Sequence, residues 1–275
     1  MTNEQAQLWN TTSGCAWVDL QPLLDQVLDP LQDPLLDAVR AGTPRRVLDV
    51  GCGTGTTTLA AARLLGTRGA CVGIDISEPM LAHARTRAEQ ANVTASFICD
   101  DAQTHAFEPA SFDMIISRLG VMFFEDFVKA FSNLRRAAKA DAELCFIAWR
   151  SPTENPFMTT AESAAAPLLP DLPSRKPDAP GQFAFADREQ VSRILASSGW
   201  SSIDIQPIDV LCRFPEPGLI PYFSRLGPVG QMLHQVDPPT RTRVIETVRA
   251  AFDPFVHGSE VRFDAACWVA RARAA

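Results

Sequence analysis

A glycine-rich segment near position 50 is the part of this sequence best suited to hold a ligand. Asp49 belongs to a short β-rich run and is followed by Val50-Gly51-Cys52-Gly53-Thr54-Gly55, after which apolar residues recur at helical spacing. Glycines in a turn between a strand and a helix let a ligand approach the backbone closely, because they lack a Cβ and tolerate positive φ. Dinucleotide-binding turns have the spacing GxGxxG, whereas this turn has GxGxG, and Asp49 would repel a pyrophosphate. The segment favours a ligand with a cationic, amino-acid-like group, although such a turn can also merely join a strand to a helix.

Acidic residues follow the next two expected strands. Asp75 ends the run Val72-Gly73-Ile74-Asp75, where a carboxylate can accept hydrogen bonds from both hydroxyls of a ribose. Asp100-Asp101-Ala102 follows the third strand, where an acidic residue can accept from an adenine amino group. Met80 could lie against adenine or pack its helix on the sheet. An isolated aspartate pair is more often a solvated loop, but in register with Asp49 and Asp75 it indicates a nucleoside site.

These residues need strands that alternate with helices, and the apolar pattern predicts such a scaffold. Expected strands cover 46–50, 70–76, 95–99, 112–117 and 144–149, with helices at 56–65, 77–91 and 125–138. Alternation of this kind predicts βαβ units and a parallel sheet. A helix from 187 and two strands near 203–210 and 261–269 complete the expected fold. It is α/β, a Rossmann-like doubly wound seven-stranded sheet, mostly parallel with an antiparallel last strand, helices on both faces and helical lid insertions.

Three segments fall outside this core. The start has helical spacing interrupted by prolines, which predicts two or three short helices, and 150–186 has too many prolines for a regular sheet or a long helix. About 45 residues join the last two strands, where a short hairpin would normally suffice. The expected division is 1–43 as an N-terminal helical lid segment, 44–150 as the ligand-binding core, 151–186 as an irregular crossover or lid, 187–212 as core helix and strand, 213–258 as a helical lid insertion and 259–275 as the last core strand.

Composition narrows the function classes. Acidic residues outnumber basic ones, 32 to 25, and the net charge of -7 argues against a nucleic-acid substrate. We expect no signal peptide and no membrane span, because no sufficiently long apolar run occurs. The seven cysteines are scattered without any CxxC, which favours a reducing, cytoplasmic location and no metal site.

The motifs together resemble those of a known enzyme family. Asp49 to Gly55, Gly73-Ile74-Asp75-Ile76-Ser77, Asp101-Ala102 and Phe112-Asp113-Met114-Ile115-Ile116-Ser117 are similar to the successive motifs of class I S-adenosylmethionine (SAM)-dependent methyltransferases. The resemblance is to the small-molecule branch similar to the ubiquinone and menaquinone C-methyltransferases, and it covers about residues 44–150. One departure is Lys139-Ala140-Asp141-Ala142, where the family usually has Lys-Pro-Gly-Gly.

The resemblance implies SAM as cofactor and assigns residues to its parts. Asp49, Gly51 and Gly53, with Cys52 in the same turn, would surround the methionine amino group, and Asp75 would hold the ribose. The remaining cofactor residues would be Ile76 and Met80 beside adenine, Asp101 and the backbone of Ala102 at the adenine edge, and Ser117 near the methionine end.

The catalytic residues and the acceptor are less defined by the sequence. Methyl transfer demands mainly that acceptor, methyl carbon and sulfur lie in line, so a general base is optional. His105, Arg118, Tyr222 and His234 are candidates to touch the acceptor, and each also suits a surface or packing role. Aromatic residues outside the core favour a small, partly apolar or aromatic acceptor with an O, N or C nucleophile.

Two alternatives stay open at this point. One is a SAM-fold enzyme with non-methylating chemistry, and the other is a non-catalytic regulator that binds SAM or S-adenosylhomocysteine (SAH). The protein is expected to be a monomer or a homodimer.

Overall fold

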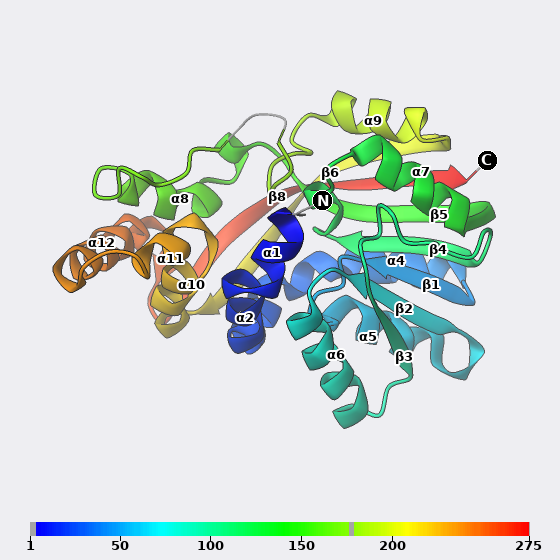
Figure 1. Ribbon diagram of the computed structural model, residues 1–275, viewed down its shortest axis with the longest axis horizontal. Coiled ribbons are helices and arrows are strands. Elements are labelled where there is room, and N and C mark those ends of the chain that lie inside the picture. Colours follow the sequence, from blue (N-terminus) through cyan, green and yellow to red (C-terminus); the bar gives the residue numbers. More distant parts are fainter. Residues whose placement is uncertain (1–3, 176–178, 275) are drawn as a thin grey trace.

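One sheet in the order β3-β2-β1-β4-β5-β8-β6, with β7 paired to β8, forms the centre of the molecule (Figure 1). The computed structural model describes residues 4–175 and 179–274. The strands are β1 (Arg46–Val50), β2 (Ala70–Asp75), β3 (Ala95–Cys99), β4 (Phe112–Arg118), β5 (Ala138–Trp149), β6 (Trp200–Pro215), β7 (Val256–His257) and β8 (Glu260–Ala274). The first five strands pair in parallel, and β8 is antiparallel to both β5 and β6. The predicted mostly parallel sheet with an antiparallel last strand is confirmed; the two-residue β7 was not predicted.

Helices lie around this sheet. They are α1 (Glu4–Asn10), α2 (Thr12–Asp19), α3 (Gln21–Leu28), α4 (Asp33–Gly42), α5 (Thr56–Leu65), α6 (Glu78–Gln90), α7 (Phe127–Ala137), α8 (Pro156–Ala165), α9 (Arg188–Ser197), α10 (Leu219–Arg225), α11 (Gly227–Leu233) and α12 (Pro238–Ala251). Helix α5 packs on β2, α6 on β3, α9 on β6, and α7 on α9. None of the helices within the described ranges is long and apolar enough to cross a membrane.

The apolar runs that predicted strands form the core. In β1, Val47, Leu48 and Val50 are at most 1% exposed, and Ile115 and Ile116 of the neighbouring β4 are fully buried. Parallel strands covered on both faces are expected to be apolar at successive positions rather than at alternate ones. Asp49 is the exception within β1, since it is acidic and only 1% exposed.

Prolines divide the N-terminal segment as expected, but into more helices than predicted. Pro22 and Pro34 lie in the first turns of α3 and α4, where the missing N–H has no partner to lose. Pro30 lies in the short 3-10 helix between them. The described part of this segment therefore has four α-helices, α1 to α4, instead of two or three.

Strands β6 and β8 continue beyond the sheet as a two-stranded ribbon. Strand β5 ends at Trp149, opposite Cys267, whereas β6 and β8 stay paired as far as Pro215 and Glu260. The antiparallel pairing expected between the last two strands is thereby confirmed. Helices α8, α10, α11 and α12 gather around the far end of this ribbon (Figure 1).

The interpretation of 150–186 as wholly irregular was wrong in one part, because α8 forms within it. Pro156 lies in the first turn of this helix, where proline is tolerated, and no other proline occurs before α8 ends at Ala165. Phe157 anchors the helix by stacking on Phe263 of β8, with ring centroids 3.9 Å apart.

The altered turn before the fifth strand keeps a glycine-like backbone. Residues 138–142 belong to β5, and Asp141 adopts φ +62° at a place where the family has glycine. Aspartate tolerates this left-handed conformation better than most side chains do. The turn lies at the opposite end of β5 from Trp149, which lines the cavity described next.

Candidate functional site

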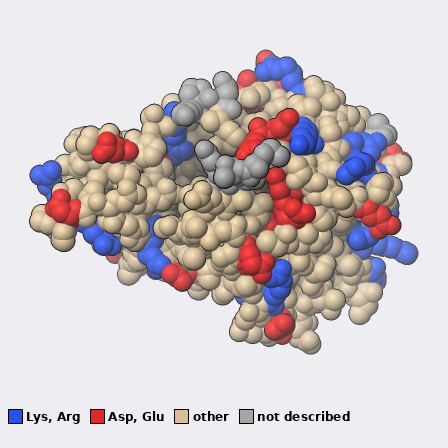
Figure 2. All heavy atoms as spheres, viewed as in Figure 1, with Lys and Arg blue, Asp and Glu red and all other residues tan. Residues whose placement is uncertain are grey.

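A cavity of about 1000 Å³ opens at the carboxyl ends of β1, β2 and β4. Strand β2 lies on one side of β1 and strand β4 lies on the other, so the strand order reverses at β1. The cavity lies at this point, which is the usual ligand site of open α/β sheets. Figure 2 shows a hollow near the middle of this face, with acidic side chains gathered beside it.

The glycine turn after β1 forms the floor of this cavity. Gly51 and Gly53 have φ +67° and +53°, and a Cβ on Gly51 would lie 2.7 Å from Gly120 Cα. Gly120 lies on the loop after β4, so only glycine at both positions lets the two backbones meet. Ser117 fixes this contact: its Oγ donates to Val50 O (2.7 Å) and accepts from Gly120 N (3.1 Å).

Asp49 presents a buried carboxylate to the cavity. Thr58 Oγ1 donates to Asp49 Oδ2 (2.6 Å), whereas Asp49 Oδ1 has no hydrogen-bond partner within the described residues. Burial raises the pKa of Asp49 to about 7, while the Thr58 hydrogen bond and nearby Arg118 oppose that rise. A buried acceptor without a donor is costly, so this oxygen suits a ligand that supplies a cationic N–H.

Asp75 is joined to the glycine turn. Its Oδ2 accepts from Gly53 N (2.8 Å) and its Oδ1 accepts from Ser77 N (2.9 Å). Burial raises the pKa of this carboxyl, and these backbone donors oppose the shift. Each carboxylate oxygen can accept a second hydrogen bond, so both remain open to donors from a ligand in the cavity.

The residues assigned to adenine also belong to this cavity. Ile76, Met80, Asp101 and Ala102 all line it. Asp101 Oδ1 accepts from Gln103 N (2.9 Å), which fixes the turn after β3 and leaves Oδ2 without a hydrogen-bond partner in the described part of the chain. Leu81, the residue after Met80 in α6, is fully buried and does not line the cavity, so it packs α6 on the sheet.

A polar clamp, formed by Arg87, Asp25 and Thr56, holds the glycine turn after β1. The sequence did not predict it. Arg87 of α6 pairs with Asp25 of α3 (2.6 Å) and donates to Thr54 O (2.8 Å). Thr56 Oγ1 donates to the same aspartate (2.6 Å). Because these residues lie far apart in the sequence, no local spacing could have revealed the clamp.

The first two helices are attached to the loop after β2. Asn10 Nδ2 donates to Ile76 O (2.8 Å), Asn10 Oδ1 accepts from Glu78 N (2.9 Å), and Ser77 Oγ donates to Trp9 O (2.6 Å). This attachment places Trp9 and Trp17 at the cavity, with ring centroids 5.9 Å apart. The N-terminal helices are thus anchored to the loop after β2, beside the cavity.

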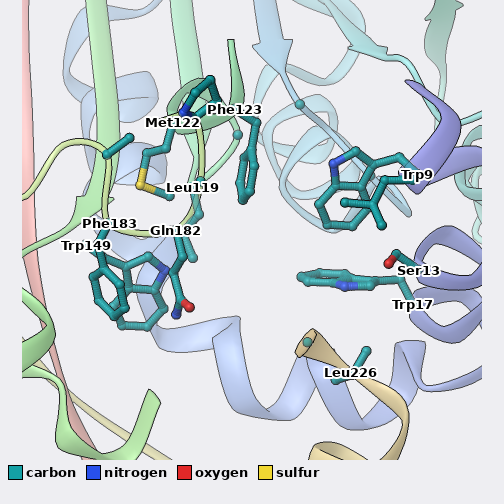
Figure 3. A pocket seen from close by; sticks show the side chains of 18 of the residues that line it. Trp9, Ser13, Trp17, Leu119, Met122, Phe123, Trp149, Gln182, Phe183 and Leu226 are labelled. Atoms are coloured by element: carbon teal, nitrogen blue, oxygen red, sulfur yellow. The ribbon is translucent and has the colours of Figure 1, made fainter. Parts of the chain in front are cut away.

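The rest of the cavity is bounded mainly by aromatic and apolar side chains. Trp9, Ser13 and Trp17 lie on one side, Trp149, Gln182 and Phe183 lie on the other, and Phe123 points between them (Figure 3). Tyr222 of α10 also lines the cavity and donates through its hydroxyl to Met158 Sδ (3.5 Å). Burial raises the pKa of Tyr222, so the phenol stays protonated at neutral pH.

The four candidates for acceptor contact separate into two pairs. Arg118 and Tyr222 line the cavity. His105 does not; its Nδ1 pairs with Asp100 (2.7 Å) and its ring packs against Phe107. His234 is exposed just after α11, away from the cavity lining.

Among the proposed cofactor residues, Asp49, Gly51, Cys52, Gly53, Asp75, Ile76, Met80, Asp101 and Ala102 all line the cavity. Ser117 is fully buried, does not line it, and acts on the turn from behind. Its side chain holds the turn, and its position near the methionine end of a bound cofactor stays a prediction.

The site agrees with what this chain resembles. A family model described as a methyltransferase domain matches residues 47–141. The chain is 35% identical over 105 residues to the aklanonic acid methyltransferase DauC of Streptomyces sp. (strain C5), which covers 38% of this chain and 48% of that protein. It is 28% identical over 185 residues to the demethylmenaquinone methyltransferase of Renibacterium salmoninarum, covering 64% of this chain and 74% of that protein.

A solved structure shows the same fold. The SAM-dependent methyltransferase from Aquifex aeolicus superposes with a TM-score of 0.55 at 16% identity, over 94% of this chain and 97% of that one. The sequence matches are shorter, and the chain spans about half the length of several curated relatives it matches. Residues 47–141 thus match a methyltransferase domain, and the order of the strands is that of a Rossmann-like fold.

Proposed function

We propose that this protein is a SAM-dependent methyltransferase that moves the methyl group of SAM to an O, N or C nucleophile of a small, partly apolar or aromatic metabolite. The observation that carries the proposal is the buried, unpartnered Oδ1 of Asp49, which lies beside a glycine turn in the same cavity as Asp75 and Asp101. A carboxylate for an ammonium, a second for ribose hydroxyls and a third for an adenine amino group match the parts of SAM.

The residues present fit this cofactor. Asp49 and the glycine turn would hold the methionine ammonium, and Asp75 would hold the ribose through lone pairs not used by Gly53 and Ser77. Asp101 and Ala102 would read the adenine edge. The close contact between Gly51 and Gly120 leaves no room for a side chain there, so the backbone itself forms the cradle.

The chain's own part in catalysis is then positioning and exclusion of water. Bound SAM supplies a methyl group already activated by its sulfonium, so the protein must place the acceptor in line with it. Trp9, Trp17 and Phe123 cover the cavity and remove water from the reacting groups.

The acceptor would bind between the core and the segments outside it. Tyr222, Phe223 and Leu226 from 213–258, and Gln182 and Phe183 from 151–186, line the part of the cavity beyond the glycine turn. We therefore infer that both segments act as an acceptor lid. The methyltransferases for aklanonic acid and demethylmenaquinone named above support a small-molecule acceptor.

Cellular location and assembly belong to the same proposal. A cytoplasmic location is supported by seven free cysteines, five of them buried, which function as small apolar residues. The chain would act as a monomer or a homodimer, and light scattering of the purified protein distinguishes the two.

The experiment that tests the proposal is incubation of the protein with methyl-labelled SAM and a metabolite extract, followed by mass spectrometry. We expect one or more labelled small molecules together with SAH. Consumption of SAM without a labelled product would favour non-methylating chemistry, and binding of SAM without turnover would favour a regulator.

A further inference from the structure

We propose that Arg118 binds the carboxylate of the cofactor's methionine group, opposite Asp49, so that the two side chains recognise the amino acid as a zwitterion. This inference rests on the proposed function, because it requires that SAM occupies the cavity. The glycine turn and Asp49 account for the ammonium only, and the carboxylate also needs a partner.

Arg118 and Asp49 project from the same face of the sheet at the edge of the cavity. In the parallel pairing of β1 with β4, Asp49 is opposite Ile116. Side chains two residues apart in a strand lie on the same face, so Arg118 lies on the face of Asp49 and one step nearer the strand end. Both residues line the cavity.

The two charges are close without touching. Arg118 lowers the pKa of Asp49, which burial otherwise raises, so its positive charge acts on that carboxylate. Their nearest oxygen and nitrogen atoms nevertheless form no ion pair within the described residues, although such a pair would satisfy both. A zwitterion bound between them would place its ammonium beside Asp49 and its carboxylate beside Arg118.

Arg118 differs from the other arginines at the cavity in having no ion pair with any residue in 4–175 or 179–274. Arg175 makes a bidentate pair with Glu162 (2.9 Å and 2.6 Å), and Arg225 pairs with Asp19. Within the part of the chain described, Arg118 makes a single hydrogen bond, from Nη1 to Leu28 O (3.1 Å). A guanidinium has five N–H donors in a planar fork that fits a carboxylate, so most of this fork remains open to a ligand.

A purely structural role is the competing explanation. Arg118 also feels the charges of Asp25 and Asp29, and its bond to Leu28 joins β4 to α3. In that role, loss of the charge would affect every ligand of the cavity equally or would lower stability alone. The proposed role affects only ligands that carry the carboxylate.

The test compares SAH with 5′-methylthioadenosine, which keeps the adenosine and the thioether but lacks the amino acid. Calorimetry on Arg118→Gln should show roughly 10- to 100-fold weaker SAH binding, the loss expected for charge-assisted hydrogen bonds. Affinity for 5′-methylthioadenosine should stay within about twofold, because that ligand does not reach Arg118. Arg193→Gln, on the exposed surface of α9, is the matched control and should bind both ligands normally.

A second measurement uses only the wild-type protein and therefore holds even if Arg118→Gln folds poorly. Decarboxylated SAH keeps the ammonium, and it should bind the wild-type protein roughly 10- to 100-fold more weakly than SAH does. In Arg118→Lys, which keeps the charge without the fork, SAH binding should be intermediate.

Equal loss of SAH and 5′-methylthioadenosine in a folded variant would overturn the assignment, and so would unchanged SAH binding. Wild-type binding of SAH and decarboxylated SAH with equal affinity would also overturn it. In each of these cases SAM can still be the cofactor. Failure of the wild-type protein to bind SAH at all would instead refute the proposed function, and this inference with it.

Discussion

Gly53 and Asp75 are joined by a hydrogen bond of 2.8 Å from the glycine N–H to the carboxylate Oδ2, across two neighbouring strand ends. The bond orients the carboxylate toward the turn that follows β1. Asp75 thus shapes the glycine turn and presents the remaining lone pairs of its carboxylate to the cavity. Changes at Asp75 are therefore expected to affect ligand binding through both effects.

Asp75→Ala should weaken SAM binding by roughly 10- to 150-fold, the effect of losing about 1.5 to 3 kcal/mol of charge-assisted hydrogen bonding. The fold should persist, because Asp75 ends its strand at the cavity and its loss leaves Gly53 N facing solvent there. Calorimetry with SAH measures the loss, and a thermal melt checks the fold. SAH affinity equal to wild type in a folded variant would show that Asp75 has no part in the site.

Gly53 and Gly51 should respond differently to a side chain. A Cβ on Gly53 meets only Met80 Sδ, at 3.8 Å, whereas a Cβ on Gly51 would collide with Gly120 Cα at 2.7 Å. Gly53→Val should therefore fold with some backbone strain and lose SAM binding, because its side chain enters the cavity. Gly51→Val should be strongly destabilised. Normal turnover by Gly53→Val would contradict this geometry.

SAH affinity should depend on pH through Asp49. Its pKa is raised to about 7, with Arg118 and Asp75 as the nearby charges, so the carboxylate is mostly ionised at pH 8 and mostly protonated at pH 6. An ammonium prefers the ionised form, so affinity should fall by about tenfold between pH 8 and pH 6. Asp49→Asn should bind more weakly at pH 8 and lose this dependence. A pH-independent wild-type affinity would refute the assignment.

Changes in the helices of the 213–258 segment should alter the binding of the acceptor but not the binding of the cofactor. Tyr222→Ala should change acceptor affinity or selectivity, while SAH affinity stays within about twofold because the tyrosine lies beyond the glycine turn. Met232 of the neighbouring helix α11 does not line the cavity. Met232→Ala therefore serves as a control with little effect on either ligand. Loss of SAH binding in Tyr222→Ala would place this helix over the cofactor.

The core was predictable because its signals are local. Apolar runs such as 46–50 and 112–117 predict buried parallel strands, and the acidic residues after three strands meet because the carboxyl ends of parallel strands share an edge. The helical spacing of Val244, Ile245 and Val248 likewise indicated a helical segment between the paired strands. The strands that pair, Trp200–Pro215 and Glu260–Ala274, are longer than their apolar patterns suggested.

The parts that sequence missed depend on contacts between distant residues. The ion pair of Arg87 with Asp25 joins α6 to α3, and the hydrogen bond from Ser77 to Trp9 joins the loop after β2 to α1. No residue spacing predicts these contacts. At the end of β4, alternation could have separated Ser117 from Arg118: only Arg118 shares the face of Asp49, and only Arg118 lines the cavity. Helix α8 was not predicted because the segment around it is rich in proline. The sequence alone does not distinguish a proline in the first turn of a helix from a proline that interrupts one.

The most direct test of the account is a calorimetric titration of the wild-type protein with SAM, SAH and NAD⁺ under the same conditions. The account predicts saturable binding of SAM and SAH at a single site and no heat with NAD⁺. Tight binding of NAD⁺ without binding of SAM or SAH would contradict it.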